Sequence, residues 1–241
     1  MTYTELVTAI QTYTENTFPA TTLADSTVVS STTQINRFIE QAEQRIYNSV
    51  QFPSLRKNVV GTVTAANKYL TCPDDFLATY SMAVIGTDGA YEYLLNKDVN
   101  FIRQAYPNPT TDVGIPKYYA LFGPNVTNSV ITDELSFIVG PTPDAAYNVE
   151  LHYYYYPESI SVASDGHTWL GDNFDTVLLY GSLVEAYTYM KGEQDIMAFY
   201  DLKYKEALAL AKRLGDGLER SDAYRSGQYR EAPLPQNTGV R

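Results

Sequence analysis

The sequence predicts an α+β protein: a helical bundle formed by the N- and C-terminal helices, an inserted antiparallel β domain, and an extended C-terminal arm. Apolar residues recur at helical spacing near both ends, short β-rich runs with turn residues fill the middle, and periodicity stops after Gly215. We therefore expect a bundle from residues 1–55 and 170–215, a β-rich insertion over 56–169 and an arm over 216–241.

Two helices are expected in the N-terminal part. The first covers residues 2–17, where Thr2 and Glu5 match a capping box. The second begins at Ser31, which forms the same pattern with Gln34, and a loop over residues 18–31 separates the two. Its apolar stripe consists of Ile35, Phe38, Ile39, Ala42 and Ile46. The polar residues between them fall mostly off the stripe: Glu40, Glu43, Gln44 and Arg45.

The middle of the chain predicts strands. Residues 86–89 (Gly-Thr-Asp-Gly) predict a hairpin turn, because Asp-Gly tolerates positive φ. A short helix is expected over 98–106. In the strand over 149–155, Val149, Leu151 and Tyr153 share one face. Further strands are expected over 58–63, 81–85, 90–95, 118–122 and 135–139.

Two helices are expected after the β-rich part. Asp172 or Asn173 caps the first, and Gly192 takes the C′ position after it. The second runs over 195–214 and ends at Gly215. Its expected apolar face consists of Ile196, Phe199, Tyr200, Ala207, Ala211 and Leu214.

Composition narrows the class of protein. Hydrophobic residues make up 44% of the 241 residues and charged residues 19%, which is enough apolar material for a packed core. The chain has 22 tyrosines and one tryptophan. Tyrosine combines apolar area with a hydroxyl that tolerates water, so it suits interfaces; a tyrosine-rich sheet core with hydroxyls at the rim explains the number equally well.

The charge balance argues against a nucleic-acid binder. The formal net charge is −11, whereas such proteins usually carry a basic face. An acidic wall would repel phosphates, so DNA is expected only as passing cargo. The N-terminal residues do not resemble a signal peptide and no apolar run is long enough to cross a membrane, so we expect the protein to be made and used in a cytosol-like compartment.

No pattern in the sequence predicts catalysis, a cofactor or a metal. Asp74 and Asp75 are adjacent, so their side chains point in different directions. His167 lies in a glycine-containing loop without a nucleophile motif, and Cys72 is the single cysteine. We therefore expect that the protein is not an enzyme.

Several stretches resemble the head-to-tail adaptor (connector) proteins of bacteriophages, a family that includes the tail tubular protein A type and the adaptor of SU10-like phages. The similar stretches cover most of residues 32–212 and are found at 38–46, 52–56, 70–76, 115–119, 141–143, 153–157, 179–187 and 200–207. Their order carries more weight than any one motif. Where the family usually has leucine before the proline of the third stretch, this chain has Cys72.

The resemblance implies a structural subunit of a homo-oligomeric ring, usually a dodecamer in this family, that joins the portal protein to a tail nozzle or tube protein at the head-tail junction of the virion. It also implies assembly in the host cytoplasm. It also implies that the C-terminal arm binds the portal. The arm residues expected to do so are Arg220, Tyr224, Arg225, Tyr229, Arg230 and Leu234. Two alternatives stay open: another tail component, such as a tail-completion or tube protein, and a carbohydrate-binding tail module.

Overall fold

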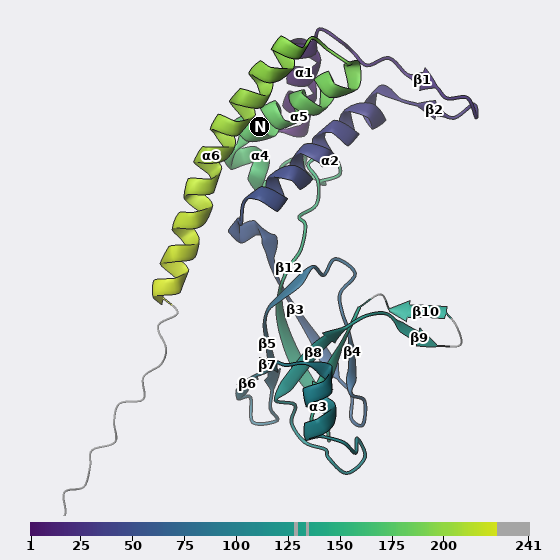
Figure 1. Cartoon of the computed structure of the whole chain (residues 1–241), viewed down its shortest axis with the longest axis vertical. Helices are drawn as coiled ribbons and strands as arrows, with labels where there is room; N and C mark the ends of the chain where they lie inside the picture. Colours follow the sequence, from purple (N-terminus) through teal and green to yellow (C-terminus); the bar gives the residue numbers. More distant parts are fainter. Residues whose placement is uncertain (128–129, 134, 226–241) are drawn as a thin grey trace, which may run out of the picture. The chain divides into compact units, whose positions relative to one another are not determined.

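Figure 1 shows the computed structural model, which describes residues 1–127, 130–133 and 135–225. The fold is α+β, and the described residues form six α-helices and twelve short strands. The chain divides into two compact units. The helical unit consists of Met1–Pro53 and Glu158–Arg241, and the β unit consists of Ser54–Pro157.

The helical unit is built around α5 (Asp175–Met190), which contacts α1 (Tyr3–Thr14), α2 (Ser31–Ser49), α4 (Trp169–Asn173) and α6 (Gln194–Arg225). Leu178 and Leu183 of α5 are fully buried, and so is Ala186. A helix that is apolar on most of its circumference must be covered on several sides, which explains the central position of α5.

The helix starts agree with the sequence only in part. Thr2 and Glu5 form the expected capping box of α1. The predicted box at Ser31 is wrong, because Ser30 caps α2 and accepts the N–H of Thr33. Gln34 is buried and donates instead to the carbonyl of Pro19. Inside the predicted loop, β1 (Thr21–Thr22) and β2 (Val28–Val29) pair as a hairpin.

The predicted cap of α5 is also wrong. Asp172 and Asn173 belong to α4, which Thr168 caps, while α5 starts after Phe174 without a side-chain cap. At the other end of α5, the left-handed residue is Lys191, with φ 54°, and not Gly192. A Cβ at position 192 would lie 2.7 Å from Cδ1 of Tyr187, so glycine serves close packing there.

The last helix extends beyond its predicted end. Gly215 does not stop α6, which continues to Arg225, so residues 216–225 are helical and not an extended arm. Gly215 lies close to the chain after α2: a Cβ there would come 3.0 Å from the carbonyl oxygen of Gln51. The glycine permits this close approach inside a continuous helix.

The β unit contains two four-stranded sheets. The first has the order β3 (Arg56–Val63), β12 (Tyr147–Tyr154), β5 (Ala78–Ile85) and β6 (Tyr91–Tyr93), all antiparallel. The second has the order β4 (Tyr69–Thr71), β11 (Ser136–Gly140), β8 (Tyr118–Phe122) and β7 (Leu95–Asn96). Its β7–β8 pair is parallel. A separate hairpin joins β9 (Asn125–Thr127) to β10 (Val130–Asp133).

Side chains from both sheets share one core. Met82, Val149 and Tyr153 of the first sheet pack in the same buried cluster as Phe137 of the second, and Cys72 is part of it.

The predicted hairpin between β5 and β6 is confirmed, with Gly89 at φ 81°. The predicted short helix is α3 (Val99–Ala105), which Asp98 caps, and Pro53–Leu55 forms a 3₁₀ turn before β3.

Candidate interaction surfaces

No metal-binding cluster occurs within the described parts of the chain. There, no group of three or more His, Cys, Asp and Glu side chains is placed to hold an ion. No described helix is both long and apolar enough to cross a membrane.

His167 forms a hydrogen bond with Asp172 at the protein surface. Its Nδ1 lies 3.0 Å from Oδ1 of that carboxylate, and both side chains are exposed. The hydrogen bond to Asp172 raises the pKa of His167 above its ordinary value. The amino group of Met1 donates to the carbonyl of Gly171 at 2.8 Å, so the cluster fastens the start of α1 to α4. Nothing in it resembles a nucleophile with its base.

Asp75 has a structural role. Its Oδ1 accepts the hydroxyl of Tyr153 at 2.7 Å and its Oδ2 lies 2.6 Å from Nζ of Lys57. Burial opposes ionisation, but the hydrogen bonds from Lys57 and Tyr153 outweigh it and lower the pKa of Asp75. The carboxylate is therefore charged at neutral pH and joins the turn after β4 to β3 and β12.

The run of four tyrosines is divided between two environments. Tyr153 is buried and its ring stacks on Phe76. Tyr154 lies on the opposite face of β12, where its ring meets Tyr80 edge-on and the guanidinium of Arg56 lies over both rings. Because its first ring is in the core, the run does not form one continuous stacking platform. Exposed tyrosines of the same sheet include Tyr80, Tyr91 and Tyr93.

An exposed apolar stripe runs along α6, and we call it the α6 stripe; the ion pair between Lys203 and Glu206 interrupts it between Leu202 and Leu210. Phe199 is 53% exposed and Leu210 is 64% exposed. At about 100° per residue, the members fall within about a third of the helix circumference. The α6 stripe consists of Ile196, Phe199, Leu202, Leu210 and Leu214.

The α6 stripe corrects the predicted apolar face of this helix. Ile196, Phe199 and Leu214 were expected to be buried but are exposed. Ala207 and Ala211 are buried as expected, and the buried side also contains Tyr204, which the sequence did not single out. Arg45 of α2 pairs with Glu185 and lies over the ring of Tyr204 at 5.9 Å. The core of the unit thus takes Tyr204 and two alanines of α6 and leaves Ile196, Phe199 and Leu214 uncovered.

A groove lies between the β1–β2 hairpin, α2 and the end of α5; we call it the hairpin groove. Its volume is about 410 Å³. The ring of Phe38 packs against Phe18 and Tyr189, at 5.3 and 5.2 Å between centroids. The hydroxyl of Tyr189 donates to Oε1 of Gln34 at 2.9 Å. The lining residues are Thr21, Leu23, Val29, Gln34, Arg37, Phe38, Gln41, Glu185, Thr188 and Tyr189.

Little in the sequence predicted this groove. The hairpin strands are two residues each, too short for an alternation pattern. One signal was present: the polar residue Gln34 lies four residues before Phe38, at the spacing that places both on one side of a helix. A buried amide needs partners, and the hairpin carbonyl of Val29 is one of them, at 3.4 Å.

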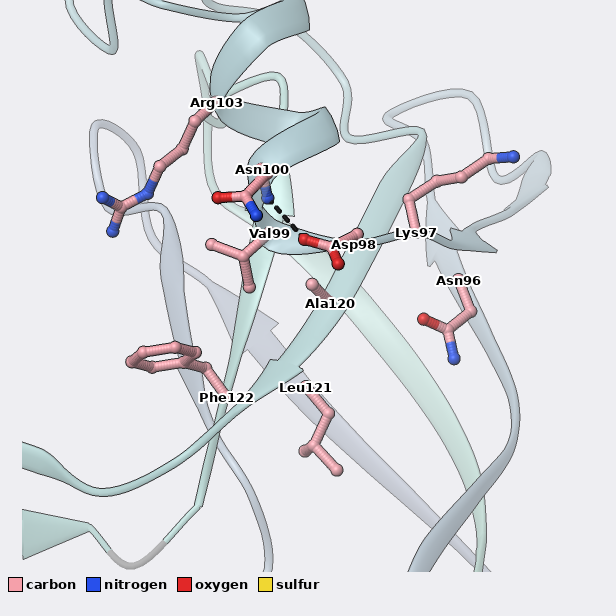
Figure 2. Close-up of a pocket in the computed structure, with 9 residues that line it drawn as sticks. All are labelled: Asn96, Lys97, Asp98, Val99, Asn100, Arg103, Ala120, Leu121 and Phe122. Carbon is pink, nitrogen blue, oxygen red and sulfur yellow. Dashed lines mark hydrogen bonds between the residues drawn. The ribbon is translucent and has the colours of Figure 1, made fainter.

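Another hollow, in the β unit, lies beside α3 and has a volume of about 640 Å³ (Figure 2). Lys97 and Arg103 flank it, and exposed Leu121 and Phe122 line one side. Its one carboxylate, Asp98, accepts the N–H of Asn100 at 2.7 Å, as the dashed line shows. That carboxylate is used to cap the helix, so the hollow presents no acid–base pair.

The predicted arm residues fall in two groups. Arg220, Tyr224 and Arg225 lie in the last turns of α6. Tyr229, Arg230 and Leu234 lie outside the described residues.

Comparison with protein families gives a match over most of the chain. A family model described as the SU10 adaptor protein matches residues 1–231. A search of curated proteins finds no match. The family match covers both the helical unit and the β unit.

Proposed function

Because this chain belongs to the SU10 adaptor protein family, a family of phage head-to-tail adaptors, we propose that it is the subunit of a ring that joins the portal protein to the tail. The observation that carries this proposal is the family match over residues 1–231. In this proposal copies of the chain surround the DNA passage, the complex is part of the virion, and a tail nozzle or tube protein binds on the side away from the portal.

The surface chemistry supports an assembly role. The α6 stripe and the hairpin groove leave apolar side chains uncovered, and surfaces of this kind mark protein interaction sites. The acidic groups most suggestive of chemistry, Asp75, Asp98 and Asp172, are each engaged in a local structural contact. A net charge of −11 suits a channel through which DNA slides without being held.

The C-terminal segment is proposed to bind the portal. Arg220, Arg225 and Arg230 would pair with acidic groups, and Tyr224, Tyr229 and Leu234 would anchor the segment. Because α6 continues to Arg225, the segment begins as a helix.

A truncation tests this proposal. Deleting residues 226–241 leaves α6 intact, so the variant should keep the circular dichroism spectrum and melting temperature of the full chain. Its affinity for the portal should fall, because Tyr229, Arg230 and Leu234 are removed while Arg220, Tyr224 and Arg225 remain. Retention of full-length portal affinity would remove the segment from the proposed mechanism.

Electron microscopy tests the adaptor role itself. Negative-stain images of the full chain mixed with its portal should show an added ring on the portal. If the chain instead assembles only on tail components, it is a tail-completion or tube protein and the portal-joining role is wrong.

A further inference from the structure

We propose that neighbouring copies of this chain contact each other by placing the α6 stripe of one copy in the hairpin groove of the next. The inference rests on the proposed ring and assigns the two surfaces that would build it. Both surfaces belong to the helical unit, so their relative placement within one copy is defined.

The two surfaces lie on opposite sides of α5. Tyr187 of α5 packs against Tyr200 of α6, with 5.0 Å between ring centroids. Tyr189, two residues later, packs against Phe38 of α2 at the groove. Two residues apart on a helix means about 200° around its axis, so the two rings point in nearly opposite directions. Figure 1 shows the same relation, with α6 and the β1–β2 hairpin on either side of α5.

This placement suits a closed ring. A contact between two different surfaces of identical chains is heterologous, and it repeats from copy to copy until a rotation closes it. Tyr187 and Tyr189 are in the same helical turn, so the α6 stripe near Phe199 and the hairpin groove lie at a similar level along α5. Neighbours could therefore stand side by side and not stack end to end.

The hairpin groove and the α6 stripe match in size and in apolar character. The hairpin groove holds about 410 Å³, whereas a cavity of about 150 Å³ already accommodates a benzene ring. The N-terminal part of the α6 stripe offers Ile196, Phe199 and Leu202 within two turns. Leu23 and Tyr189 of the groove are themselves exposed, so both sides would lose apolar surface to water. A helix laid in an apolar groove is a common recognition mode.

Two opposite charges, one in the hairpin groove and one beside the α6 stripe, favour one orientation of the stripe in the groove. Arg37 lines the groove, and none of the described residues forms an ion pair or hydrogen bond with it. Asp195 precedes Ile196, on the same side of α6 as the stripe, and it too has no ion-pair partner in the described chain. Seating Ile196 and Phe199 in the groove would bring Asp195 of one copy toward Arg37 of the next.

Charge reversal tests the pairing. Arg37→Glu and Asp195→Arg should each weaken self-association by at least about tenfold, because each puts like charges together at the contact. The double variant should recover association, and so should an equimolar mixture of the two single variants. In that mixture each reversed groove can receive a reversed stripe. Association is measured by sedimentation velocity and native mass spectrometry, on the portal if the full chain assembles only there.

Two controls keep the test interpretable. Lys212→Glu makes the same charge change as Arg37→Glu at an exposed position of α6 outside the stripe, and should leave association unchanged. Melting temperatures of all variants should stay near that of the unchanged protein, because neither Arg37 nor Asp195 forms an ion pair with another described residue. A small decrease is expected for Asp195→Arg, since Asp195 lies in the first turn of α6.

The outcomes separate the inference from the proposed function. Rings that persist in both single variants, or single variants that neither the double variant nor the mixture restores, overturn the inference and leave the adaptor role in place. A full chain that forms no oligomer alone or with its portal overturns the proposed function itself.

Discussion

The carboxylate of Glu43 in α2 accepts the backbone N–H of Ile160 at 3.0 Å, from a segment 117 residues later in the chain. The sequence placed Glu43 off the apolar stripe, yet only 3% of its surface is exposed. This single buried acid thus fastens the chain to α2 where it re-enters the helical unit.

Glu43 makes stability depend on pH. Burial raises the pKa of Glu43 above its ordinary value of 4.5, and the nearby Glu40 adds to the effect, while hydrogen bonds from Ser159 and Ile160 oppose it. The folded state therefore holds this proton more tightly than the unfolded state, and this contribution to stability falls as pH rises from about 4.5 to the raised pKa. It is constant above that.

Glu43→Gln should remove this dependence. An amide oxygen can still accept from Ile160, so the variant should be at least as stable as the unchanged protein at pH 7. Urea midpoints at pH 4.5 and 7 measure the effect, with Glu193→Gln, at an exposed glutamate away from Glu43, as control. An unchanged pH dependence in Glu43→Gln would show that another group is responsible.

Tyr153→Phe should destabilise the β unit by about 1 kcal/mol, because it removes a hydrogen bond to the partly exposed, charged Asp75. Tyr154→Phe is the matched control: its hydroxyl has no hydrogen-bond partner among the described residues, so its loss should cost less than about 0.5 kcal/mol. Denaturant unfolding measures both. Equal effects would refute the role of the Asp75 contact.

Lys191→Gly should stabilise the protein by up to about 1 kcal/mol, because Lys191 adopts a left-handed conformation that glycine takes without steric cost. The adjacent Gly192→Ala should destabilise it by about 1–3 kcal/mol, since a Cβ would lie 2.7 Å from the Tyr187 ring. Thermal melts distinguish the two. The opposite order would mean that Gly192 is the left-handed residue, as the sequence alone suggests.

Gln34 and Tyr189 should be energetically coupled. Tyr189→Phe removes the hydroxyl that donates to Gln34, and we expect a loss of about 1 kcal/mol. In the Gln34→Ala background the same change should cost little, giving a coupling of about 1 kcal/mol in a double-mutant cycle. Tyr91→Phe, at an exposed tyrosine, serves as control. A coupling near zero would show that the hydrogen bond does not hold the hairpin groove together.

The sequence alone determined the features that depend on near neighbours. The capping box of Thr2 and Glu5 and the turn at Gly89 each require only a few consecutive residues. The order of the longer helices and strands followed from periodicity for the same reason, whereas the short elements β1, β2, β9, β10 and α4 were not predicted. The family resemblance, confirmed by the match over residues 1–231, also depended only on the order of local stretches.

The tertiary structure decided which side of a helix is covered. Apolar residues occupy more than one side of α6, so periodicity could not choose between Phe199 and Tyr204; contact with α2 and α5 buries Tyr204 and leaves the α6 stripe exposed. Glu43 and Gln34 became buried because remote backbone groups supply their hydrogen bonds. The physical reason is the same for α6, Glu43 and Gln34. A residue is buried when a remote part of the chain packs over it, and the residues within one helical turn do not determine which part does so.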